Sequence, residues 1–170
     1  MFADIEAATG IKLPHGFAKL VAAVTMMRLR AELRTIPHVV HALTWLRGPK
    51  CVASSSPLDR VRASLECTDL LRFFEPNLFS ASFVHAGKPA PDLFLHAAES
   101  MGTAPGDCLV VEDSPAGVSA AVAAGMTAIG FVGGGHAALS LGSHLTAAGA
   151  KMVVADMRSL KGAVVALRGH

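Results

Sequence analysis

Residues 107–126 decide the fold, and they read DCLVVEDSPAGVSAAVAAGM. Residues 108–111 form a short apolar run, typical of a strand that is buried on both faces, and two acids, Glu112 and Asp113, follow it directly. Ser114 is a favourable N-cap and the proline after it favours the first helical position, so a helix is expected next. Two unpaired acids at the end of a buried strand cost free energy unless a cation or hydrogen bonds receive them. The acidic corner between this strand and this helix is therefore the first candidate for a functional site.

The same alternation of apolar runs and helical patterns extends along the chain. We expect strands at residues 50–53, 78–84, 108–111, 126–132 and 151–155, and helices at residues 17–34, 37–48, 92–101, 114–125 and around 160–167. Ser56 is expected to cap a further helix that begins at Pro57. Strands that alternate with helices predict an α/β fold, in which a parallel sheet is flanked by helices on both faces.

Composition bounds the class of protein. The chain has 170 residues, a net charge of +2 and 16% charged residues, which fits one compact domain with a small appendage and gives no basic face for nucleic acid. Three cysteines and a start without the charge pattern of a signal peptide favour a reduced, cytoplasmic protein. Residues 114–150 contain no Asp, Glu, Lys or Arg, but glycines interrupt them, so no membrane partner is expected.

Polar side chains follow three successive predicted strands. Ser54 and Ser55 come after the first, Lys88 follows the second in the segment HAGKPAPD, and Glu112 and Asp113 follow the third. In an open parallel sheet, ligands bind beyond the carboxyl ends of the strands, and helix N-termini there favour anions. Hydroxyl and ammonium groups suit a phosphate, whereas proteins hold Mg²⁺ with one or two carboxylates, phosphate oxygens and water. These residues therefore predict a Mg²⁺-phosphate site.

Three motifs resemble those of the haloacid dehalogenase-like (HAD) hydrolases. They read VASSS around Ser54, GKPAPD around Lys88, and VVEDSPAG around Asp113, and the resemblance covers roughly residues 36–135. The chain looks most like the branch of β-phosphoglucomutase and small sugar-phosphate phosphatases. The resemblance implies a Rossmann-like α/β core over residues 36–170, preceded by residues 1–35 as the remnant of a helical cap.

The resemblance also implies a role for each matched residue. Ser54 would hydrogen-bond the transferring phosphoryl group, with Ser55 beside it at the phosphate. Lys88 would neutralise the phosphoryl charge and steady the nucleophile. Asp113 would bind Mg²⁺ directly, and Glu112 would bind the ion or its waters.

One part of the family pattern is absent from the sequence. The family's first motif, Asp-x-Asp-Gly-Thr, supplies the aspartate nucleophile and the acid/base at the end of the sheet's usual central strand, and this chain has no Asp-x-Asp. Without that strand, two rows of backbone groups have to pair with each other or stay unpaired, which is costly. We therefore expect an N-terminally truncated member that has no phosphatase turnover by itself.

The function that the resemblance implies is that of a Mg²⁺-dependent phosphatase of small phosphorylated metabolites. A catalytically dead remnant or non-enzymatic binding protein, a phosphosugar mutase and a receiver-type phosphorylation switch are the alternatives. A monomer is favoured for an intact homologue. His38 and His41 are interpreted as surface histidines, because no third metal ligand accompanies them. The glycines at 133–135 are interpreted as a turn, because they lack the spacing of a dinucleotide loop.

Overall fold

A computed structural model describes residues 2–135 and 139–168 and divides the chain into two units, residues 1–33 and residues 34–170. The division falls close to the predicted boundary at residue 36. That the first unit is the remnant of a cap stays a prediction.

The described residues of the first unit form two helices. They are α1 (Phe2–Thr9) and α2 (Phe17–Glu32), so the helix predicted at residues 17–34 is present with nearly the expected bounds. None of the residues of α2 is buried, and Leu20 and Met27 are 62% and 64% exposed. The helix that carries the predicted apolar stripe is thus present, and every residue of it is at least partly exposed.

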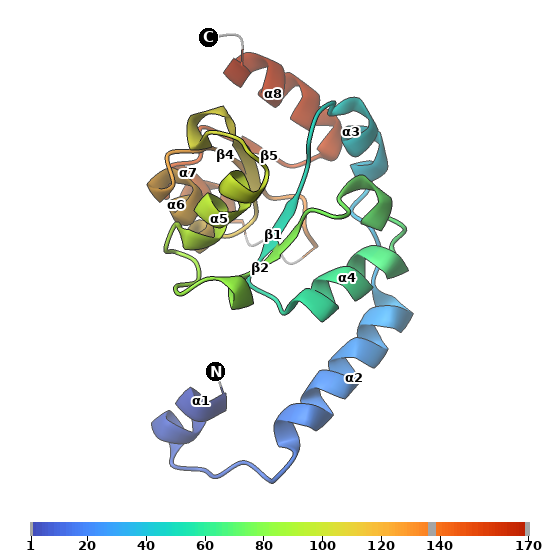
Figure 1. Ribbon diagram of the computed structural model, residues 1–170, viewed down its shortest axis with the longest axis vertical. Helices are drawn as coiled ribbons and strands as arrows, with labels where there is room; N and C mark the ends of the chain where they lie inside the picture. The colour runs from blue at the N-terminus through green and yellow to red at the C-terminus, as the bar shows by residue number, and fades with distance from the viewer. Residues whose placement is uncertain (1, 136–138, 169–170) are drawn as a thin grey trace. The chain divides into compact units, whose positions relative to one another are not determined.

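The second unit is an α/β fold in which every strand pairs in parallel (Figure 1). Within residues 34–135 and 139–168, its strands form two sheets, one in the order β1-β2 and the other in the order β3-β4-β5. The strands are β1 (Val52–Ser54), β2 (Leu78–Ser80), β3 (Leu109–Glu112), β4 (Thr127–Phe131) and β5 (Met152–Val154). The helices are α3 (Val39–Trp45), α4 (Leu58–Cys67), α5 (Asp92–Ser100), α6 (Pro115–Ala123), α7 (Leu141–Ala147) and α8 (Leu160–Arg168).

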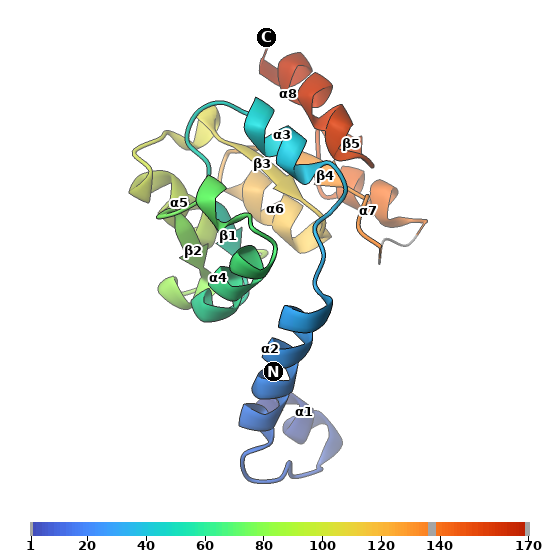
Figure 2. The ribbon, with the colours of Figure 1, turned by 90° about the vertical axis from the view of Figure 1, so that its right-hand side faces the viewer.

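Helices cover both faces of the three-stranded sheet, as Figure 2 shows for α3 and α8 on one side and α6 on the other. Successive residues of a strand point to opposite faces, and β4 follows this rule. Ala128 packs into the cluster formed with α5, α6 and α7, whereas Ile129 and Phe131 pack into the cluster formed with α3 and α8. The predicted flanking of parallel strands by helices is therefore confirmed.

The cluster on the α6 face is built mainly from alanines. Six of its members are buried alanines: Ala98, Ala120, Ala121, Ala124, Ala128 and Ala150. Small side chains allow α6 to approach β3 and β4 closely, which fixes where the start of this helix meets the end of β3.

Two local predictions were wrong. The strand predicted at residues 78–84 ends at Ser80, because the Ser80 hydroxyl accepts a hydrogen bond from the Ser82 backbone N–H and turns the chain into a 3₁₀ helix. Ser56 does not cap α4, whose N-cap position is Pro57. The backbone of Ser56 is instead held by two other serines, because its N–H donates to the Ser54 hydroxyl and its carbonyl oxygen accepts from the Ser80 hydroxyl.

Candidate phosphate and metal site

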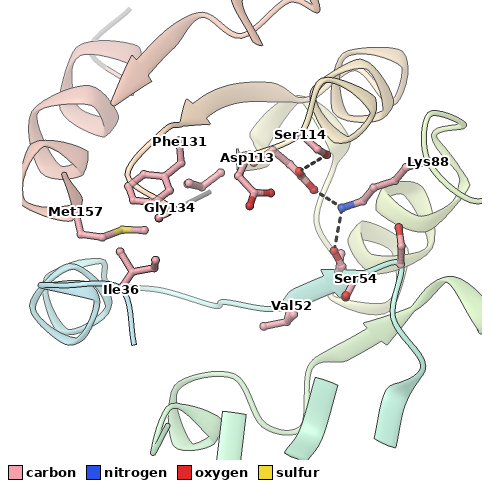
Figure 3. A pocket seen from close by; sticks show the side chains of 14 residues that line it. Ile36, Val52, Ser54, Lys88, Asp113, Ser114, Phe131, Gly134 and Met157 are labelled. Atoms are coloured by element: carbon pink, nitrogen blue, oxygen red, sulfur yellow. Dashed lines mark hydrogen bonds and ion pairs between the residues drawn. The ribbon is translucent and has the colours of Figure 1, made fainter. Parts of the chain in front are cut away.

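Residues from the ends of three structural segments line one open cavity of about 510 Å³ (Figure 3). Ser54 and Ser55 come from the end of β1, Lys88 from the loop before α5, and Glu112 and Asp113 from the end of β3. The sequence predicted that these side chains would meet at one edge of the fold, and the structure brings all of them together. Their roles in binding and catalysis are a separate question and stay predictions.

Ser54 lies in a turn that hydrogen bonds hold from two sides. Its hydroxyl oxygen accepts a hydrogen bond from the Ser56 backbone N–H at 3.1 Å. The buried Ser80 hydroxyl, 1% exposed, donates to the Ser56 carbonyl oxygen at 2.8 Å from the neighbouring strand β2. The turn after β1 is thereby anchored to β2, and the Ser54 hydroxyl keeps a fixed position at the cavity.

Lys88 connects the two sheets. Its ammonium group donates to the Ala53 carbonyl oxygen of β1 at 3.2 Å and forms an ion pair with Glu112 at the end of β3. The ammonium group also lies 4.7 Å from the centre of the Phe94 ring, which favours a cation at this point. Both the Lys88 and Glu112 side chains are only 10% exposed, so each charge depends on the other for compensation.

Glu112 is fixed by the helix that follows it. Its second carboxylate oxygen accepts a hydrogen bond from the Ser114 hydroxyl at 3.0 Å, and that hydroxyl accepts one from the Gly117 backbone N–H at 3.1 Å. A Cβ atom on Gly117 would collide with the Glu112 carboxylate. The predicted N-cap at Ser114 is therefore confirmed, and the same residue also orients an acid of the site.

Asp113 is exposed at the cavity, next to the Lys88–Glu112 pair. Its carboxylate and that of Glu112 are the oxygen donors that this corner offers to a hard cation. In the described part of the chain, no three His, Cys, Asp or Glu side chains gather as a ready metal cluster. A divalent cation here would therefore take its remaining ligands from water or from a bound phosphate, which is the coordination typical of Mg²⁺.

The opposite end of the cavity is apolar and was not predicted as part of the site. Ile36, Phe131 and Met157 line it together with Gly134 and Gly135, whose turn after β4 was predicted. The positions of Ile36 and Met157 depend on long-range packing of α3 and of the segment after β5, for which a local sequence pattern gives no signal. The cavity is thus polar at the strand ends and apolar along its other side.

The chain belongs to the haloacid dehalogenase-like hydrolases, since residues 3–125 match the model of that family. It is 31% identical over 128 residues to the 6-phosphogluconate phosphatase of Escherichia coli, an alignment covering 75% of this chain and 58% of that protein. The resemblance inferred from the three motifs is therefore confirmed at the level of the family.

Solved structures agree with this assignment. A haloacid dehalogenase-like protein of unknown function from Agrobacterium tumefaciens is 35% identical, with a TM-score of 0.84, and the match covers 98% of this chain and 76% of that one. A HAD family hydrolase from Deinococcus radiodurans, solved with bound phosphate and sodium, is 27% identical, with a TM-score of 0.78 and coverages of 96% and 72%. The chain thus spans less than two thirds of the length of the E. coli relative and about three quarters of these two structures.

None of the helices in the described part of the chain combines the length and the apolar character that crossing a membrane requires.

Proposed function

We propose that this chain provides the phosphate- and Mg²⁺-binding part of a phosphatase that acts on small, sugar-phosphate-like metabolites. The observation that carries the proposal is the meeting of Ser54, Lys88 and Asp113 at one cavity. The name of the E. coli relative, a phosphatase of a phosphorylated sugar acid, and the phosphate bound in the Deinococcus structure support this class of substrate.

The charge of the site favours a cation as a partner of the phosphate. Among the described residues that line the cavity, Lys88 is positive and Glu112 and Asp113 are negative, so a phosphate dianion alone would meet net repulsion. Mg²⁺ held by Asp113, with Glu112 or its waters beside it, would reverse the sign of the local charge and bridge to a phosphate oxygen. Phosphate binding is therefore expected to depend on Mg²⁺.

Each of the remaining residues has a proposed task in binding the phosphoryl group. The Ser54 hydroxyl donates a hydrogen bond to a phosphate oxygen, with Ser55 beside it. Lys88 neutralises phosphate charge and shares its ammonium protons between the phosphate and the carboxylate of Glu112. Ser114 keeps that carboxylate in place while Lys88 is shared.

We further propose that residues 1–170 bind but do not hydrolyse phosphate esters by themselves. A covalent phosphoryl transfer needs a nucleophile held in line with the phosphorus, and the sequence has no Asp-x-Asp motif to supply one. The proposed chain thus shares the phosphate site of the enzyme and the lack of turnover of the binding protein, the two alternatives given by the sequence. The cytoplasmic location and the monomeric state stay predictions.

Isothermal titration with inorganic phosphate, with and without Mg²⁺, tests the binding site. Binding is expected only with Mg²⁺, and Asp113→Asn and Lys88→Met are each expected to weaken it about tenfold or more. Glu99→Gln, an exposed acid of α5 away from the cavity, is the matched control and should leave it unchanged. Equal affinity in all four proteins would contradict the proposed site.

Turnover is tested separately with p-nitrophenyl phosphate and Mg²⁺. No steady hydrolysis above the rate without protein is expected. Steady hydrolysis that Asp113→Asn abolishes would show that the chain is a complete enzyme and would overturn the second half of the proposal, while leaving the binding site intact.

A further inference from the structure

Two oxygen acceptors already use N–H groups of the Lys88 ammonium. An ammonium group has three N–H donors, and this one donates to the Ala53 carbonyl oxygen and to the Glu112 carboxylate. Figure 3 shows both interactions as dashed lines from the Lys88 nitrogen. Lys88 also lines the cavity, although its side chain is only 10% exposed. One N–H group is therefore left for a ligand, and its direction depends on what else holds the ammonium.

The ring of Phe94 is the third neighbour of this ammonium group. Its centre lies 4.7 Å from the Lys88 nitrogen, a distance at which the negative face of an aromatic ring attracts a cation. Phe94 is 5% exposed and packs in the core cluster with Val118 and Ala121 of α6. Because these neighbours are close-packed, the core and not the ligand determines where the ring lies. Phe94 does not line the cavity itself, so it acts on a ligand only through Lys88.

Lys88 and Phe94 belong to one closed unit of loop and helix. The Ala86 backbone N–H donates to the carboxylate of Asp92, the first residue of α5, at 3.3 Å. Within the loop, a further backbone hydrogen bond of 3.0 Å spans residues 87–90. The loop that carries Lys88 is thereby tied to the start of the helix that carries Phe94, which brings the lysine side chain to the ring.

We propose that Phe94 is a positioning residue of the phosphate site, whose ring holds the Lys88 ammonium where its third N–H group faces the cavity. The ion pair with Glu112 cannot do this alone, because a bound phosphate shares the ammonium protons with that carboxylate. The ring and the Ala53 carbonyl oxygen keep their contacts, and they restrict a side chain that is otherwise flexible. This role rests on the proposed function, since phosphate is the ligand that the third N–H group meets.

Ring fluorination tests the role of Phe94 with little change of shape. Phe94 is replaced by phenylalanine analogues with one, two or three ring fluorines, which weaken the negative face of the ring stepwise. Isothermal titration with inorganic phosphate and Mg²⁺ is expected to show an affinity that falls with each fluorine, by about fivefold over the series. The same series at Phe79, a buried ring of β2 that packs edge-on against His96, is the matched control and should leave the affinity unchanged. Equal affinity across the Phe94 series, or equal losses in both series, would overturn the proposal.

Two further measurements separate positioning from a general effect on folding. In Lys88→Met, which removes the ammonium group, three fluorines at Phe94 should weaken phosphate binding no further, because the ring acts through Lys88. An additional loss as large as that in the unchanged background would overturn the proposal. Urea unfolding of each protein checks the fold. A loss of phosphate affinity only in proteins whose urea midpoint also falls would mean that Phe94 has a structural role alone, and this too would overturn the proposal.

The position of the Lys88 ammonium can also be followed without phosphate. In protein with isotope-labelled lysine nitrogens, NMR measures the exchange of ammonium protons with water, and comparison with Lys88→Met identifies the Lys88 signal. Its exchange is expected to become about threefold faster over the Phe94 series and to stay constant over the Phe79 series. Faster exchange in a chain that binds no phosphate would overturn the proposed function but support the contact of Phe94 with Lys88. Phosphate binding with unchanged exchange and affinity would overturn the role of Phe94 alone.

Discussion

At the residue scale, Gly117 is required by the acid that precedes its helix. A methyl group at this position would meet the Glu112 carboxylate, whose place is fixed by Lys88 and Ser114. We expect Gly117→Ala to reduce the free energy of unfolding by about 1–3 kcal/mol, because the carboxylate cannot move without breaking its ion pair. Urea unfolding measures this loss.

Gly162 is the matched control for Gly117. Both are the third residue of a nine-residue helix, but a Cβ atom on Gly162 would meet nothing within 4 Å. Gly162→Ala is expected to stabilise the protein by about 0.5–1 kcal/mol, because alanine is the better helix former. Equal effects of the two substitutions would show that helix propensity alone, and not the contact with Glu112, determines the result.

Cys51 makes the stability of the folded protein depend on pH in the alkaline range. Burial, aided by Cys108, raises the pKa of the Cys51 thiol from 9.0 to about 11. The folded state therefore binds the thiol proton more tightly than the unfolded state, so this stabilisation is complete below about pH 9 and is lost as the pH rises through about 11. We expect the urea midpoint of Cys51→Ala to fall less between these pH values than that of the unchanged protein.

Cys67, which is exposed at the end of α4, provides the control. Cys67→Ala should keep the pH dependence of the unchanged protein, since both contain the same lysines and the same buried thiol. If the urea midpoints of Cys51→Ala and Cys67→Ala change with pH in the same way, the Cys51 thiol is not the cause of the pH dependence.

The site residues that could be predicted from the sequence are those whose side-chain chemistry suits the site and which directly follow a predicted strand. The Ser54, Lys88 and Glu112–Asp113 corners follow strands, and the topology of a parallel fold gathers strand ends at one edge, so their meeting was predictable. The pairing of Lys88 with Glu112 was not, because it depends on how two loops approach each other across the cavity. The failure of Ser56 to cap α4 has the same origin, a long-range hydrogen bond from Ser80.

At the element scale, the start of α6 combines a helix cap with the orientation of an acid. The Ser114 hydroxyl accepts from Gly117 and donates to Glu112. Ser114→Ala is expected to lower the free energy of unfolding by about 1 kcal/mol or more, since both bonds are lost. Thermal or urea unfolding followed by circular dichroism measures the effect.

Ser140 occupies the corresponding position of α7 but makes no side-chain capping bond. Ser140→Ala should therefore change the stability by less than about 0.5 kcal/mol. A similar loss in both variants would argue that serine at the N-cap position matters for reasons other than its side-chain hydrogen bond.

The helices and strands that could be predicted are those that the local sequence marks clearly. The helices at 92–101 and 114–125 and the strands of the second sheet appear within two residues of their expected bounds, because capping residues and apolar runs mark them. Helices α1 and α7 were not identified, since their short sequences mix apolar and polar residues without a clear stripe. The division of the strands into two sheets is a tertiary property, for which a local sequence pattern gives no signal.

At the scale of the whole molecule, the two units are expected to differ in resistance to proteolysis. Helix α2 buries none of its residues and carries Arg28 and Arg30 on exposed positions near its end, followed by Arg34. Such a helix opens locally at little cost. Limited digestion with trypsin should cut after these three arginines first and leave a fragment that begins near residue 35, as mass spectrometry of the products can show.

Arg62 is the internal comparison for this digestion. It lies on α4 in the second unit, where it pairs with Glu75. Cleavage at Arg62 that is as early as cleavage at Arg28 would mean that the second unit is no more resistant than the first.

The alanine-rich cluster under α6 determines which amino-acid substitutions the core can tolerate. Its six alanines are already near the smallest size that a side chain can have, so truncation removes little volume at these positions. Enlargement has no room, because Ala120 and Ala121 are both 0% exposed. Evolutionary change at the alanine positions is therefore confined to glycine, serine and alanine, while the leucines and phenylalanines of the core can be exchanged for other large apolar residues.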